Sequence, residues 1–397
     1  MAFRSKLRLL TLQRNRPFSS SILSPESKTA LSSKEKSRAA LSLLRFEKEP
    51  ERIVDICRAA SFTPDSHLDR AAYSVAISKL QKSNDYESIR SIIRDSLSRP
   101  DFRSERSVSH LIVLYGQAGL VEDAINLFDE MPDLGIQASV KALNSLLFSC
   151  AIAGEYGEMK RVFSEFPRKY GLEPNLDTYN TLLKGLCESG SANSAHSILA
   201  EMESKGIKPD AKTFSVAIAG FYKEEKFDDV EKMIVLMKKY GVQKGIGVYN
   251  VMIQSLCKLK RSNEAKALLD EILSRNMKPN CVSYAHLITG FCKEGKLDVA
   301  KVLFEEMVRR ELKPDADCYF TMVHYLCKGH DFEVALGICK QCMSKGWIPN
   351  ITTMKSLVNG LVSVEKVDEA KEIIAVMKEK FSRNADKWIE IEEGLPK

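Results

Sequence analysis

The chain lacks the features that mark several protein classes. No uninterrupted apolar run approaches about 18 residues, so no membrane-spanning helix is predicted. Twenty glycines and 13 prolines in 397 residues are too few for a collagen-like or low-complexity chain. The ten cysteines are scattered, with none before Cys57, which argues against a dense disulfide framework and favours reduced thiols. With 44% apolar and 28% charged residues, the composition is instead typical of a folded protein.

Acidic residues are absent from the start of the chain up to Glu26. Phe3, Leu7 and Leu10 would share one face of a helix, and serines follow from Ser19. A basic, serine-rich, acid-free amphipathic segment is typical of an organellar transit peptide. The cations of this segment are Arg4, Lys6, Arg8, Arg14 and Arg16.

We therefore predict that residues 1–30 are a mitochondrial transit peptide and a disordered linker. The run from Arg16 to Ser20 resembles the cleavage context of plant mitochondrial presequences, which places removal near Phe18/Ser19 and the mature protein in the matrix. A chloroplast address and a disordered basic tail are the less favoured alternatives. Removing these five cations would lower the net charge from +6 to +1, so total charge says little about a nucleic-acid partner.

A period of 35 residues runs through most of the chain. Tyr249, Tyr284 and Tyr319 follow one another at this spacing, and Lys278-Pro279-Asn280 and Lys313-Pro314-Asp315 end successive units. A degenerate helical unit is predicted over 35–69 and a C-terminal tail over 386–397. The nine predicted repeats are 70–104, 105–139, 140–175, 176–210, 211–245, 246–280, 281–315, 316–350 and 351–385.

Each unit reads as two amphipathic helices. In 281–315, apolar residues recur at helical spacing from Tyr284 to Phe291 and again from Ala300 to Met307. Alanine recurs at the position of Ala300 in other units, which predicts a close approach of helices there. A helix of about twelve residues is marginal alone, so neighbouring units must stack to bury their apolar faces. The pattern predicts an all-α solenoid of stacked helix pairs.

Catalytic, cofactor and metal motifs are missing. The six histidines form neither His-Glu-x-x-His nor a zinc-deaminase signature, and there is no glycine-rich phosphate loop. Cys339 and Cys342 form a lone Cys-x-x-Cys, but sister units have Leu, Phe or Met at these positions, so we interpret both as core thiols. The sequence predicts no enzyme, no cofactor and no metal site.

The unit resembles the pentatricopeptide repeat. Thr178-Tyr179-Asn180 opens a unit that closes on Gly206 to Asp210, and the turn from Phe291 to Gly295 matches the middle of the repeat. The uniform unit length is similar to that of the subclass built purely of 35-residue repeats. Within that subclass, the chain resembles proteins of plant mitochondrial type, and in particular the short ribosome-associated members. The resemblance implies a right-handed α-solenoid of stacked antiparallel helix pairs.

The resemblance also implies single-stranded RNA on the concave face, with one base per unit. The fifth and last residues of a unit would select the base, so that Asn144 with Asn175, and Asn250 with Asn280, would favour a pyrimidine and Asn180 with Asp210 uracil. The residues that would face bases are Asn144, Asn175, Asn180, Asp210, Asn250, Asn280, Val282 and Asp315.

Several units depart from this pattern. Their fifth residues are Ser215, Ala285, Phe320 and Lys355, and Phe320 could stack on a base but could not hydrogen-bond to it. Among the second residues of the units from 105 onward, Val282 is the one that fits an aliphatic contact well. Recognition of a long RNA sequence is therefore not predicted.

The thirteenth residue is lysine in five units, four of them consecutive. One cation at the same place on each stacked unit would form a track for RNA phosphates, and the alternative is a set of solvated turn lysines. These residues are Lys82, Lys223, Lys258, Lys293 and Lys328.

Three functions fit these patterns. The first is an organellar protein that binds single-stranded RNA, either mitochondrial mRNA or rRNA, in RNA metabolism or translation. The second is a structural or regulatory subunit of the mitochondrial ribosome, with ribosomal proteins as further partners. The third, least favoured, is a scaffold that binds only proteins.

Overall fold

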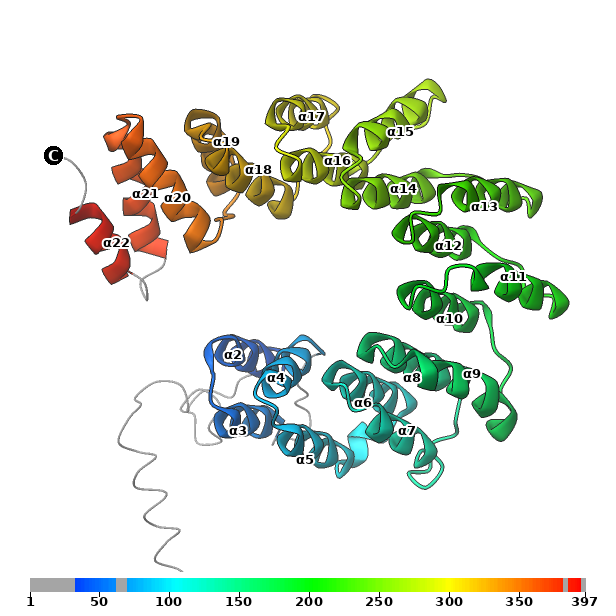
Figure 1. Ribbon diagram of the computed structural model, residues 1–397. Coiled ribbons are helices and arrows are strands. Elements are labelled where there is room, and N and C mark those ends of the chain that lie inside the picture. Colours follow the sequence, from blue (N-terminus) through cyan, green and yellow to red (C-terminus); the bar gives the residue numbers. More distant parts are fainter. Residues whose placement is uncertain (1–32, 62–69, 381–384, 394–397) are drawn as a thin grey trace, which may run out of the picture. The chain divides into compact units, whose positions relative to one another are not determined.

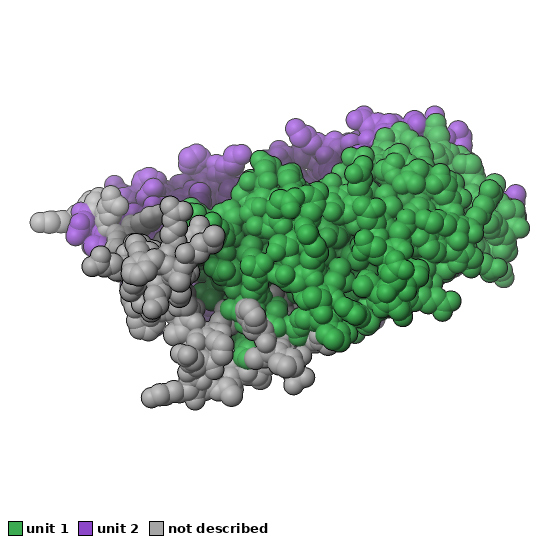
Figure 2. All heavy atoms as spheres, turned by 90° about the horizontal axis from the view of Figure 1, so that it is seen from below, with its two compact units in different colours: residues 1–208 green, residues 209–397 purple. Residues whose placement is uncertain are grey.

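The computed structural model describes residues 33–61, 70–380 and 385–393, and the predicted transit peptide lies outside these ranges. Every regular element in these ranges is a helix, which confirms the predicted all-α fold of stacked helix pairs (Figure 1). None of the described helices is long and apolar enough to cross a bilayer. The chain divides into two compact units, residues 1–208 and 209–397, coloured separately in Figure 2.

Unit 1–208 contains ten α-helices and one 3₁₀ turn, η1 (Pro100–Phe102), within its described residues. The helices are α2 (Ser33–Phe46), α3 (Pro50–Ser61), α4 (Arg70–Lys82), α5 (Tyr86–Leu97), α6 (Glu105–Ala118), α7 (Val121–Asp129), α8 (Val140–Ala153), α9 (Tyr156–Tyr170), α10 (Leu176–Glu188) and α11 (Ser194–Ser204). The helix α9 has 15 residues where α13 and α17 have 13, and the extra length falls at its end, around Arg168 to Tyr170.

Unit 209–397 is more regular. Its first helices begin at residues 211, 246, 281, 316 and 351, which keeps the 35-residue period of the sequence. The helices are α12 (Ala211–Lys223), α13 (Phe227–Lys239), α14 (Ile246–Lys258), α15 (Ser262–Ser274), α16 (Cys281–Lys293), α17 (Leu297–Arg309), α18 (Ala316–Lys328), α19 (Phe332–Ser344), α20 (Ile351–Ser363), α21 (Val367–Lys380) and α22 (Ala385–Glu393).

In both units the first helices form one continuous layer. In unit 1–208, α4 packs on α6 and α6 on α8; in unit 209–397, α12 packs on α14, α14 on α16 and α16 on α18. Each second helix packs against the first helix of its own repeat. The predicted apolar stripe of the repeat that begins at Cys281 is buried: Tyr284, Leu287, Ile288 and Phe291 are fully enclosed.

The alanine position in the second helices is a point of close packing, as predicted. Ala300 and its counterparts have no exposed surface, so no side chain larger than a methyl group fits without movement. The other members of the set are Ala124, Ala195, Ala265, Ala335 and Ala370.

The C-terminal segment differs from the prediction. We expected a tail over 386–397, but Ala385–Glu393 form the helix α22, which packs against α21. Trp388 of this helix is completely buried. The physical reason is that α21 has an apolar face that needs covering, and α22 packs on it in the way that a neighbouring repeat packs elsewhere in the solenoid.

Candidate nucleic-acid interface

Two asparagine pairs predicted to face RNA lie in contact. Asn144 of α8 donates from Nδ2 to Oδ1 of Asn175 at 3.3 Å, and Asn250 of α14 donates to Asn280 at 3.1 Å. A hydroxyl from the next first helix completes each group: Thr178 donates to Oδ1 of Asn144 at 2.6 Å, and Ser283 to Oδ1 of Asn250 at 2.6 Å.

These contacts leave part of each amide available. An amide nitrogen carries two hydrogens and its oxygen two lone pairs, and each asparagine at the fifth position uses one of each within the protein. Asn144 is half-buried, whereas Asn250 is only 8% exposed. The two pairs are therefore oriented by hydrogen bonds within the protein, and each asparagine at the fifth position keeps only part of its hydrogen-bonding capacity for another partner.

The last residues of several repeats have a structural role that the sequence analysis missed. Asn175, Asp210, Asn280 and Asp315 are N-caps, each accepting a hydrogen bond from the backbone N–H three residues later, at 2.8–3.1 Å. With Thr or Ser at that third position, the first three of these caps form reciprocal capping boxes. The spacing Asn/Asp-x-x-Ser/Thr was the signal that could have revealed them.

The remaining predicted base-facing residues differ in exposure. Asn180 of α10 is only 2% exposed, and both of its side-chain amide atoms lack a hydrogen-bond partner. Val282 at the start of α16 is 45% exposed, so it presents an apolar surface to solvent. Asp315 is exposed, although one of its carboxylate oxygens caps α18.

The five predicted phosphate-binding lysines are all exposed, and each is the last residue of a first helix. A cation at this end also interacts favourably with the helix dipole, which is the structural alternative to a role in RNA binding. Lys223, Lys258, Lys293 and Lys328 lie on four first helices that pack in succession, and we call these four residues the lysine row. Burial, and next the charge of Lys258, lower the pKa of His286 on α16.

A repeated hydrogen bond fixes the two helices within a repeat. Tyr249 donates to Glu271 at 2.7 Å and Tyr284 to Glu306 at 2.8 Å, in each case from the first helix to the second. Burial opposes ionisation of Glu306, but hydrogen bonds from Tyr284 and Arg310 outweigh it and lower its pKa. The carboxylate is thus held as a charged acceptor that links α16 to α17.

The Cys-x-x-Cys lies in the core. Cys339 and Cys342 have no exposed surface, and Sγ of Cys339 lies 3.7 Å from Sδ of both Met343 and Met354. Burial raises the pKa of Cys339 to about 12, which disfavours the thiolate that a metal would need. Over the described ranges, no three His, Cys, Asp or Glu side chains are placed to hold a metal ion.

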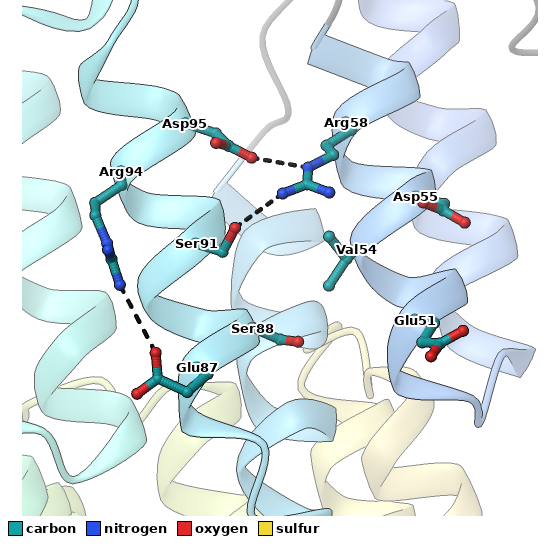
Figure 3. Close-up of a pocket in the computed structure, with 9 residues that line it drawn as sticks. All are labelled: Glu51, Val54, Asp55, Arg58, Glu87, Ser88, Ser91, Arg94 and Asp95. Carbon is teal, nitrogen blue, oxygen red and sulfur yellow. Dashed lines mark hydrogen bonds and ion pairs between the residues drawn. The ribbon is translucent and has the colours of Figure 1, made fainter. Parts of the chain in front are cut away.

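A cavity of about 690 Å³ opens between α3 and α5 (Figure 3). Arg58 of α3 spans it, bonding Asp95 at 2.8 Å and Ser91 at 2.8 Å, and Arg94 lies 3.8 Å from Glu87. The two arginines that line this cavity are thus paired with carboxylates of α5. We assign it no ligand.

Comparison with known proteins agrees with this geometry. The model described as "PPR repeat family" matches residues 174–223, 244–293 and 279–328, and the "Pentatricopeptide repeat domain" model matches 126–188. The "PPR repeat" model matches 106–136, 212–242 and 352–380. The Arabidopsis thaliana pentatricopeptide repeat-containing protein At1g11630, mitochondrial, is 53% identical over 379 residues, which are 95% of this chain and 93% of that protein. The chain belongs to the pentatricopeptide repeat family.

Further relatives of this pentatricopeptide repeat protein include a ribosomal one. Small ribosomal subunit protein mS79 (rPPR3b) of Arabidopsis thaliana is 30% identical over 166 residues, 42% of each chain. The crystal structure of the maize protein PPR10 aligns with a TM-score of 0.42 at 18% identity, covering 91% of this chain and 60% of that one. The name of the At1g11630 relative includes a mitochondrial location, which supports a mitochondrial location for this pentatricopeptide repeat protein.

Proposed function

We propose that this pentatricopeptide repeat protein binds single-stranded RNA in the mitochondrion through its first helices, without catalysing a reaction. The lysine row is the observation that carries the proposal, because it places one exposed cation at the end of each of four helices packed in succession. An RNA backbone carries one phosphate per nucleotide, so a regular row of cations suits it better than a single charged site would.

The asparagine pairs give the proposal a limited sequence preference. Asn144 with Asn175, and Asn250 with Asn280, are pre-oriented by hydrogen bonds and are our candidates for contacts with pyrimidines. Asn180 and Asp210 remain candidates for contact with uracil. Since few repeats carry such a pair, phosphate contacts dominate the affinity.

Replacing the lysine row tests the proposal. Substituting Lys223, Lys258, Lys293 and Lys328 with alanine removes four phosphate contacts, so the slope of log K against log salt for single-stranded RNA should become shallower by about 3. The matched control substitutes four lysines on second helices, which changes the net charge equally. These are Lys232, Lys266, Lys340 and Lys371. Equal slopes for the two variants would contradict the role of the row.

A ribosomal role is the second candidate. It is favoured by the similarity to mS79 and by a second relative, mS78 (rPPR3a), which is 30% identical over 169 residues. A ribosomal subunit would bind rRNA mainly through the sugar-phosphate backbone of the RNA. This mode agrees with the side-chain amides of Asn144 and Asn250, which are already partly hydrogen-bonded within the protein. Sedimentation of tagged protein with ribosomes, before and after RNase treatment, separates this role from binding to free transcripts.

We further propose that the leader directs the chain to the matrix and is removed near Phe18/Ser19. The basic, acid-free composition of residues 1–25 supports this. Amino-terminal sequencing of the mature protein would locate the cut, and uptake by isolated chloroplasts rather than mitochondria would contradict the address.

A further inference from the structure

Ser283 and Thr178 occupy the same place in their repeats, the third residue of a first helix. Both side chains are fully buried, so each hydroxyl must place its hydrogen within the protein. Ser283 accepts a hydrogen bond from the backbone N–H of Asn280 at 3.3 Å and donates to Oδ1 of Asn250 at 2.6 Å. Oδ1 of Asn280 accepts from Nδ2 of Asn250 and from the backbone N–H of Ser283, both at 3.1 Å. These four bonds form a closed hydrogen-bond ring.

The same hydrogen-bond ring is present in residues 1–208. Thr178 accepts from the backbone N–H of Asn175 at 3.0 Å and donates to Oδ1 of Asn144 at 2.6 Å. Oδ1 of Asn175 accepts from Nδ2 of Asn144 at 3.3 Å and from the backbone N–H of Thr178 at 3.1 Å. Because serine completes one ring and threonine the other, the ring depends on the hydroxyl and not on the rest of that side chain.

The hydrogen-bond ring fixes which way round the amide of the fifth residue lies. If the amide of Asn250 turned by half a turn, its oxygen would face Oδ1 of Asn280, which is also an acceptor. Its NH₂ group would then face the hydroxyl of Ser283. The turned amide would lose its bond to Asn280 and the 2.6 Å bond from the hydroxyl. An asparagine without such a ring can present its amide either way round.

Other repeats direct the hydroxyl of the third residue elsewhere. Where the preceding repeat ends in Asp210, Thr213 donates to that carboxylate at 2.9 Å. Thr353 follows a repeat whose fifth residue is Phe320, and its hydroxyl lies 3.4 Å from Nδ1 of His324. The backbone N–H of Thr353 is nevertheless capped at 2.9 Å. The cap of a first helix therefore forms without a hydrogen-bond ring.

We propose that Ser283 and Thr178 are positioning residues, whose hydroxyls fix the amide of the preceding repeat's fifth residue and thereby decide between cytosine and uracil there. The two bases carry opposite groups at one ring position, because the amino donor of cytosine is replaced by a carbonyl acceptor in uracil. A fixed amide suits one of them better, whereas an amide that can turn serves both. The inference rests on the proposed RNA binding and deepens it.

Removing one hydroxyl tests the inference in the full chain. The probe is a uridine oligonucleotide, kept as short as tight binding allows so that its register is fixed, with one cytidine placed at each position in turn. The nucleotide facing Asn250 is the one whose preference is lost in Asn250→Ala. There the unaltered protein should bind one pyrimidine about 2- to 10-fold more tightly than the other. Ser283→Ala should bring this ratio close to one, and Ser283→Thr, which keeps the hydroxyl, should retain it.

A matched control separates positioning from helix stability. Thr353→Ala removes a hydroxyl at the same place in another first helix, where the preceding fifth residue, Phe320, has no amide. It should leave the ratio at the nucleotide facing Asn250 unchanged, although both alanine variants lower stability in urea. An unchanged ratio in Ser283→Ala, an equal change in Thr353→Ala, or no preference in the unaltered protein would overturn the inference. If the salt dependence of RNA binding persists in that case, the proposed function survives and only this inference fails.

Discussion

The first helices of residues 1–208 and of residues 209–397 have the same packing but different surface charge. In 209–397, four successive first helices end in an exposed lysine. In 1–208, Lys82 ends α4, but the corresponding residues of the next three helices are Gln117, Ile152 and Glu188. Gln117 is engaged with the protein itself, donating to the carbonyl of Ser74 at 2.8 Å and to the hydroxyl of Ser78 at 2.6 Å.

The two units also differ in the residue type at the turn between the two helices of a repeat. Among the four repeats from residue 70 to 210, three have glycine at the positive-φ position that follows the first helix (Gly119, Gly154 and Gly190), and the fourth has Asn84. In 209–397, the same position is occupied by residues other than glycine in four of five repeats. These residues are Glu225, Lys260, His330 and Glu365.

The comparison distinguishes core positions, which the fold constrains, from surface positions, which can vary between repeats. Every repeat must bury the same apolar face, so the core positions match in both units. Charge at the helix ends does not affect this packing, so it can differ between the units. If the proposed RNA binding is correct, this difference predicts that the main phosphate contacts lie on 209–397.

Overpacking should have the largest effect, and it should be equal in both units. Ala300→Leu in 209–397 and Ala124→Leu in 1–208 each add bulk at a position with no exposed surface. Each should lower the free energy of unfolding by about 1–3 kcal/mol, measured by urea denaturation. Ala267→Leu, at an exposed position of α15, is the control and should change stability by less than about 0.5 kcal/mol. A loss at Ala300 with none at Ala124 would show that the two units are not packed alike.

The fold was predictable because its signals repeat. The apolar spacing of Tyr284 to Phe291 and the alanine at position 300 recur in other units, and burial of these residues follows from that spacing. The helix α22 was not predicted, because it occurs once and has no sister from which to read its register. Trp388 was its one strong signal.

Substitutions at the turn positions should change the free energy of unfolding less than overpacking does, and glycine there should raise it. Left-handed backbone costs a residue with a Cβ about 1–2 kcal/mol, and glycine avoids this cost but loses more entropy on folding. Glu225→Gly and Glu365→Gly should each therefore raise the free energy of unfolding by about 0.5–1 kcal/mol. In 1–208, Gly190→Ala should lower the free energy of unfolding by about 1 kcal/mol, because φ is 78° there. No neighbouring atom would meet the added Cβ, so the backbone conformation is the source of this cost.

A glycine inside a helix provides the control for the turn variants. Glu305 is exposed within α17, so Glu305→Gly should cost about 1 kcal/mol rather than stabilise the protein. If Glu225→Gly and Glu365→Gly were also destabilising, the backbone at those turns would not be the source of strain.

The interface was only partly predictable from the sequence. The register of the lysine row depends on residue spacing alone, so Lys258 and Lys293 fall where the sequence places them. The state of the amides depends on neighbours in the next repeat: the bond from Ser283 to Asn250 joins residues 33 positions apart, and a pattern of types does not show whether it forms. The N-cap role of Asn280 was missed for a similar reason. Its Oδ1 accepts a hydrogen bond at the start of α16, and this bond uses part of the capacity that a base contact would need.

Adding lysines to the first helices of 1–208 should have the smallest expected effect, a change in the salt dependence of RNA binding. This experiment tests directly whether the two units differ in phosphate contacts. Ile152 is exposed in the last turn of α8, and Glu188 is the exposed last residue of α10. If RNA also follows these helices, as contacts at Asn144 and Asn175 require, Ile152→Lys with Glu188→Lys should steepen the slope of log K against log salt by about 1. Asn126→Lys with Glu122→Lys, both on the exposed side of α7, changes the net charge equally and should leave the slope nearly unchanged. An unchanged slope in the first pair would confine the RNA to 209–397, and the assignment of Asn144 and Asn175 as base-facing residues would then be wrong.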